Sequence, residues 1–83
     1  MNNPESIKII DRFFEAFDAL KEMGRIKNNE RFVKMYDIPK STFYDSRRMR
    51  ESNKFQISWL AILVNDFGVS SEWLMTGKGN MFR

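Results

Sequence analysis

Apolar side chains recur at helical spacing in two stretches of this chain, and no stretch shows the alternation expected of a strand. In residues 4–23, six apolar side chains fall on one arc at about 100° per residue: Ile7, Ile10, Phe13, Phe14, Phe17 and Leu20. The stretch 57–67 is more apolar, with Trp59 and Ile62 outside a main arc of Ile57, Leu60, Ala61, Leu63, Val64 and Phe67. Two long helices and an all-α fold are therefore predicted.

Three shorter helices are expected at about 29–36, 40–49 and 71–75. Polar caps and glycine stops mark the expected helix ends: Asn3, Asn28, Ser70, Gly24 and Gly68. Pro39 disfavours a helical Ile38, so a tight turn should separate the second and third helices. Helices of eight to ten residues are marginal alone. These two must therefore be held against the long ones, with Trp73 and Leu74 of the last helix closing the core.

The composition excludes several kinds of functional site. Cys and His are both absent, which rules out disulfides, Cys/His zinc sites, a Cys nucleophile and a His base. The TGKG segment at 76–79 lacks the spacing of a phosphate-binding loop. No apolar run approaches the roughly 20 residues of a membrane span. We therefore expect one domain over 1–83, not an enzyme, with no metal, cofactor, small-molecule substrate or membrane contact.

Positive charge is concentrated in the middle of the chain. Residues 25–54 hold nine Lys/Arg against four Asp/Glu, whereas Glu15, Asp18 and Glu22 make the outer face of the first helix acidic. The outward face of helix 40–49 lies in this basic segment and is expected to present Lys40, Ser41, Tyr44, Asp45, Arg47 and Arg48. A solvated surface would look similar, but an exposed polar helix also suits the DNA major groove, which is about 12 Å wide.

Two segments resemble a known family. FVKMYDIPKSTFYDSRR at 32–48 resembles the helix-turn-helix of the lambda-repressor-like family, with its pattern apolar–Ala–x–x–apolar–Gly–Val–Ser followed by x–Ser–Thr–apolar. NDFGVSSEWLMTGKGNMF at 65–82 is similar to the G-V-S-x-x-W-L-x-x-G-x-G-x-M ending of phage CI-type repressor N-terminal domains. The resemblance covers about residues 5–82. It implies a five-helix lambda-repressor-like domain with a helix-turn-helix in helices two and three.

The resemblance also implies a function, namely sequence-specific binding of a double-stranded DNA operator by a transcriptional regulator. It implies a repressor acting as a homodimer in the cytoplasm, bacterial or phage-encoded and associated with the nucleoid. Helix 40–49 would lie in the major groove, with Lys40, Ser41 and Tyr44 at base edges. Asp45 would accept from cytosine or orient Lys40 or Arg48. The residues expected at DNA are Asn29, Lys40, Ser41, Thr42, Tyr44, Asp45, Arg47, Arg48, Arg50 and Lys54.

The chain departs from the family pattern in several places. Val33 replaces Ala, Pro39 replaces a Ser/Thr cap, and Ser46 replaces an apolar residue. Met75, Met81 and Phe82 are candidates for a subunit interface or for contacts to a missing C-terminal segment. Trp59 and Ile62 either pack under the first and fifth helices or contact a second copy. Repressors of this type usually continue past this point, which leaves open an excised N-terminal domain. A protein-interaction module, such as an antirepressor or antitoxin-like partner, is the alternative function.

Overall fold

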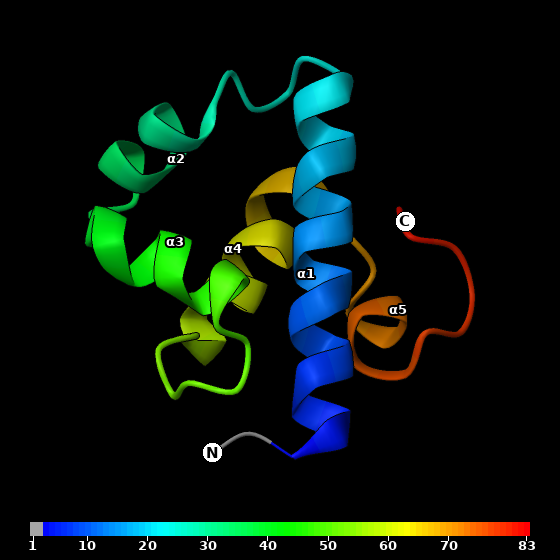
Figure 1. The fold of residues 1–83 in the computed structure, drawn as a ribbon. Coiled ribbons are helices and arrows are strands. Elements are labelled where there is room, and N and C mark those ends of the chain that lie inside the picture. Colours follow the sequence, from blue (N-terminus) through cyan, green and yellow to red (C-terminus); the bar gives the residue numbers. More distant parts are fainter. Residues whose placement is uncertain (1–2) are drawn as a thin grey trace.

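Five helices make up the computed structural model, which describes residues 3–83 (Figure 1). Their bounds are α1 Pro4–Glu22, α2 Asn29–Met35, α3 Lys40–Arg48, α4 Ile57–Phe67 and α5 Ser71–Thr76. Within the described residues no strand occurs, and Val69 and Phe82 form an isolated antiparallel bridge. The all-α prediction is confirmed, and every expected helix end lies within one residue of the observed one.

The helix ends are set largely by the predicted caps. The side chains of Asn3, Asn28 and Ser70 each accept a hydrogen bond from the backbone N–H three residues on, at 2.8, 2.7 and 3.2 Å. Pro39 provides no such bond to α3, because its side chain has no hydrogen-bond acceptor. Gly68 ends α4 with a φ of 72°, a left-handed conformation that residues with a Cβ adopt at a cost.

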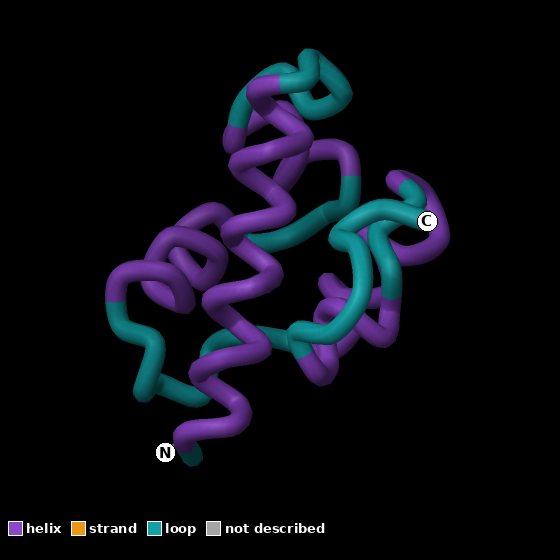
Figure 2. The backbone as a smooth tube through the Cα atoms, turned by 90° about the vertical axis from the view of Figure 1, so that its right-hand side faces the viewer, coloured by secondary structure: helices purple, strands orange, loops and turns teal. Residues whose placement is uncertain are grey.

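The long helix α1 is the element against which most of the others pack. It packs against α3, α4 and α5, while α2 packs against α3 and α4 against α5. Figure 1 shows α2 and α3 on one side of α1 and α5 on the other, and Figure 2 shows the same long helix after a quarter turn. The segment from α2 to α3 therefore lies at one side of the molecule, supported from behind by α1.

An aromatic cluster fills the space between α1, α2, α3 and α4. Phe43 of α3 is 2% exposed and lies near its centre. Its ring centroid is 5.3 Å from that of Phe17, 5.7 Å from that of Phe32 and 5.4 Å from that of Trp59. These distances are typical of edge-to-face and tilted aromatic pairs. One side chain of α3 thus contacts aromatic rings from three other helices.

The predicted arc of α4 is confirmed at Leu60, Leu63, Val64 and Phe67, which are buried or packed against the core, and is wrong at Ile57 and Ala61. Trp59 is 2% exposed and Leu63 is fully buried, whereas Ile57 is 81% exposed and Ala61 is also exposed. A helix that is apolar nearly all round does not determine its own buried face, and here the large indole fills the aromatic cluster. Trp59 is covered by α1, α3 and the ring of Phe55 rather than by α1 and α5. It is therefore unavailable to a second copy.

The C-terminal segment folds back on the helices. The backbone N–H of Ser70 donates to the carbonyl of Met81 at 2.8 Å, and that of Arg83 donates to Gly68 at 2.9 Å. Met81 and Phe82 are half-buried against the core. These two side chains therefore help to close the protein's own core, and a subunit interface at their exposed parts stays a prediction. Met75 remains 50% exposed.

Arg12 joins α1 to α5. Its Nε donates to the carbonyl of Leu74 at 2.7 Å, and its Nη2 donates to that of Met75 at 3.1 Å. These carbonyls belong to the last turn of α5, where a cation is favoured and free acceptors need partners. Gly77 turns left-handed directly beside the guanidinium, and a Cβ there would approach Nη1 to 3.3 Å.

Removal of the Phe43 ring should destabilise the protein strongly. We expect Phe43→Ala to lower the free energy of unfolding by about 3–5 kcal/mol, as is usual for buried aromatic residues. Urea denaturation followed by circular dichroism measures the change. Ser41→Ala, on the exposed side of the same helix, is the control and should stay within about 0.5 kcal/mol of the wild type. Similar losses for the two variants would contradict the position assigned to Phe43.

Candidate nucleic-acid interface

A turn of four residues, 36–39, connects α2 to α3. Within residues 3–83, Asp37 is the one non-glycine residue with a positive φ, at 55°. Short polar side chains such as Asp tolerate this region best. Beyond it, Ile38 returns to the core at 9% exposed, and its N–H donates to the carbonyl of Val33 at 2.8 Å. Asp37 thus lets the chain reverse sharply while both flanking helices stay packed.

A hydrogen bond holds the end of α2 to α4. The hydroxyl of Tyr36 donates to Oδ2 of Asp66 at 2.8 Å. Partial burial, this hydrogen bond and the carboxylate charge raise the pKa of Tyr36 from 10.0 to about 12. The neutral phenol is therefore part of the contact that positions the turn.

One face of α3 is buried and the other is open. Phe43 and Ser46 face the core at 2% and 1% exposed. The departure at Ser46 is accommodated because its hydroxyl donates to the carbonyl of Phe43 at 2.7 Å, so the buried group is satisfied. Among the predicted contact residues of α3, Lys40, Ser41 and Tyr44 are exposed, whereas Thr42 is half-buried.

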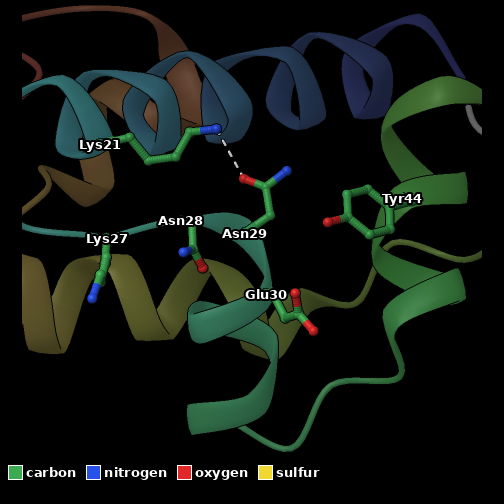
Figure 3. Close-up of a pocket in the computed structure, with 6 residues that line it drawn as sticks. All are labelled: Lys21, Lys27, Asn28, Asn29, Glu30 and Tyr44. Carbon is green, nitrogen blue, oxygen red and sulfur yellow. Dashed lines mark hydrogen bonds between the residues drawn. The ribbon is translucent and has the colours of Figure 1, made fainter.

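A shallow polar hollow of about 480 Å³ lies between the start of α2 and α3 (Figure 3). Figure 3 shows Tyr44 reaching toward Asn29, whose Oδ1 accepts from Nζ of Lys21 at 2.8 Å. The hollow is lined by Lys21, Lys27, Asn28, Asn29, Glu30 and Tyr44. Sequence reasoning missed both lysines. The signal was the short loop after Gly24, which brings the end of α1 beside the start of α2.

Asp45 connects α3 to the loop that follows it. Its carboxylate accepts from Arg48 at 2.6 Å and from Lys54 at 2.9 Å, and the hydrogen bonds from these two cations lower the pKa of Asp45. Lys40 instead lies 3.8 Å from Glu30. Of the roles expected for Asp45, the geometry shows orientation of Arg48. The resulting group of one anion and two cations keeps a net positive charge on the exposed side.

Two of the predicted contact residues turn toward α1 instead. The guanidinium of Arg47 forms two hydrogen bonds to the carboxylate of Asp18, at 3.0 and 2.6 Å, and lies over the ring of Phe14. Arg50 binds the carboxylate of Asp11. The basic segment and the acidic face of α1, which the sequence analysis treated as separate surfaces, are therefore adjacent. Part of the positive charge is neutralised within the molecule.

Nine of the ten predicted residues thus fall into three places. Asn29, Lys40, Ser41 and Tyr44 lie around the hollow and the exposed start of α3, Asp45 holds Arg48 and Lys54, and Arg47 and Arg50 bind α1. Thr42 is set back from the exposed face.

Within residues 3–83, no three Asp or Glu side chains gather as metal ligands. No helix in the same range combines the length and apolarity that a membrane span requires. Comparison with family models, curated proteins and solved structures found no match.

The strain at Asp37 should be measurable by substitution. We expect Asp37→Gly to raise the free energy of unfolding by up to about 1 kcal/mol and Asp37→Ala to lower it by about 1 kcal/mol, because alanine disfavours a left-handed conformation. Asp37→Asn removes the charge, tolerates the same conformation, and should be nearly neutral. Thermal unfolding of the three variants tests this. An Asp37→Ala variant that is more stable than the wild type would contradict the left-handed conformation of Asp37.

Stability at alkaline pH should depend on Tyr36. The folded state prefers the neutral phenol, so its contribution is complete below pH 10 and is lost as pH rises from 10 to about 12. Lysines titrate in the same range, so the comparison is with Tyr36→Phe. The difference in free energy of unfolding between the two proteins should shrink across that interval. A difference that is constant with pH would contradict the hydrogen bond to Asp66.

Proposed function

We propose that this chain binds double-stranded DNA sequence-specifically through α3 and regulates transcription, most simply as a repressor that occludes a promoter. One observation carries the proposal. The helix α3 is fixed from behind by Phe43 while Lys40, Ser41 and Tyr44 project from its first turns into solvent. A short, rigid helix with small polar and basic side chains fits the major groove and can meet base edges there.

The conformation of the family-like residues supports a helix-turn-helix of the lambda-repressor-like kind. Asp37 stands where the family pattern has Gly and adopts the left-handed conformation that Gly favours. In the C-terminal motif, Gly77 and Gly79 are also left-handed, and Trp73 and Leu74 are buried. These five residues therefore have the conformation or burial that their positions in the pattern favour.

The charge distribution supports a division of roles. Lys21 and Lys27 line the hollow that Tyr44 also lines, and Arg48 and Lys54 are held around Asp45 at the other end of α3. Phosphate contacts from such residues would supply most of the affinity. Base contacts from Lys40, Ser41 and Tyr44 would each contribute about 1–3 kcal/mol of discrimination. Two copies on a near-palindromic operator would double these contacts.

One observation favours the alternative of a protein-interaction module. Arg47 and Arg50 are neutralised by α1, which lowers the charge available for a polyanion. A protein partner would bind without a steep dependence on salt, whereas duplex DNA requires one.

Selection of bound sequences from random duplex DNA tests the function directly, because it reports binding, specificity and palindromy together. We then expect Lys40→Ala combined with Ser41→Ala to abolish the preference for the selected sequence while salt-sensitive binding to random DNA persists. Electrophoretic mobility shift or fluorescence anisotropy measures both affinities.

The matched control is Lys8→Ala combined with Ser71→Ala, which makes the same chemical change at exposed positions of α1 and α5. It should retain the preference. Selection of no sequence, or an unchanged preference in the α3 variant, would overturn the assignment.

A further inference from the structure

Two carboxylates on one face of α1 each hold an arginine from the basic segment. Asp18 binds Arg47, at the end of α3, and Asp11 binds Arg50, in the loop beyond it. Asp11 and Asp18 are seven residues apart, so they lie about two turns apart on the same side of the helix. All four side chains remain between 43% and 48% exposed. These pairs are therefore at the surface, next to the candidate interface.

A phosphate and a carboxylate compete for the same guanidinium. Arginine presents a planar fork of donors that matches both groups, and the two contacts of Arg47 with Asp18 have this forked form. Both pairs are exposed, so a phosphate that comes close competes with the carboxylate, and it must displace the existing contacts before it can bind the guanidinium. The exchange would leave Asp18 close to DNA with Lys21, 3.9 Å away, as its remaining ion-pair partner. That distance is too long for a hydrogen bond, so Lys21 would compensate the carboxylate less well than Arg47 does.

We propose that Asp11 and Asp18 are specificity-determining residues, which withhold Arg47 and Arg50 from DNA phosphates. The inference rests on the proposed function. Non-specific complexes depend almost entirely on phosphate contacts and sample many orientations, so any available arginine strengthens them. The specific complex is fixed in one orientation by the exposed start of α3, and in it both arginines stay bound to α1. Asp11 and Asp18 therefore weaken binding to the wrong sequences and leave the right one unaffected.

The pairs on α1 differ from the group around Asp45. There one carboxylate is shared by Arg48 and Lys54, so a net positive charge remains for phosphate. Each α1 carboxylate instead binds a single arginine at hydrogen-bond distance, although Asp18 also has Lys21 at 3.9 Å. The chain thus keeps some cations available and masks others, according to the helix that supplies the carboxylate.

The test compares the double variant Asp11→Asn, Asp18→Asn with the wild type on random-sequence duplex and on the selected sequence, across 50–200 mM salt. On random duplex, the slope of log affinity against log salt should steepen by about 0.9 for each freed arginine. That corresponds to roughly threefold more loss of affinity per arginine over this fourfold range of salt. Affinity for the selected sequence should change less than about twofold, so the specificity ratio falls.

The matched control is Glu15→Gln combined with Glu22→Gln. Both residues are exposed on α1, neither forms an ion pair within residues 3–83, and the net charge changes by the same amount. Its effect on the affinity for random duplex should be clearly smaller than that of the Asp11→Asn, Asp18→Asn variant. The single variant Asp18→Asn should bind random duplex more tightly than the wild type. Adding Arg47→Gln to it should remove this gain in affinity. Circular dichroism establishes that each variant is folded.

Equal gains in the control and the test variant would overturn the inference, because bulk charge would then explain them. Unchanged affinity for random duplex would also overturn it, and so would a weaker specific complex alone, which would indicate a purely structural clamp. Failure of the proposed function is recognised by a different result, namely that the wild type shows no sequence preference. If none of the proteins binds duplex DNA, both proposals fall together.

Discussion

The packing of Phe43 against aromatic rings of α1, α2 and α4 is the contact on which the rest of the structure depends. A helix of nine residues has little stability of its own, and α3 exists because this ring is buried among the others. Eight phenylalanines in 83 residues give a small chain large apolar volumes for this purpose. The same burial fixes which face of α3 is open, so the core determines the surface that is available for recognition.

Electrostatics adds a second level of organisation to this surface. Basic residues of the segment 25–54 are in different situations: Lys27 lines the hollow, Arg48 and Lys54 share Asp45, and Arg47 and Arg50 are neutralised by α1. The net charge of +3 describes none of these situations. What a polyanion meets is set by which cation lies beside which carboxylate, and those neighbours come from different helices.

Most of the secondary structure could be predicted from sequence because its signals are local. Caps at Asn3, Asn28 and Ser70 act over three residues, and helical periodicity acts over one or two turns. The buried face of α4 could not be predicted, since a helix apolar on every side is oriented by its neighbours. The partners of Arg47 and Arg50 lie 29 and 39 positions away, and Arg12 binds carbonyls more than 60 positions away. Local sequence patterns do not predict contacts between residues that lie this far apart in the chain.

The attachment of α5 through Arg12 has a consequence for sequence variation. The guanidinium donates hydrogen bonds to the main-chain carbonyls of Leu74 and Met75. Every residue type has the same carbonyl. The position of this short helix therefore does not depend on the identity of its exposed side chains, such as Glu72 and Met75. Those positions are free to diverge while the helix keeps its place, so that new surface chemistry can arise on α5 without a new fold.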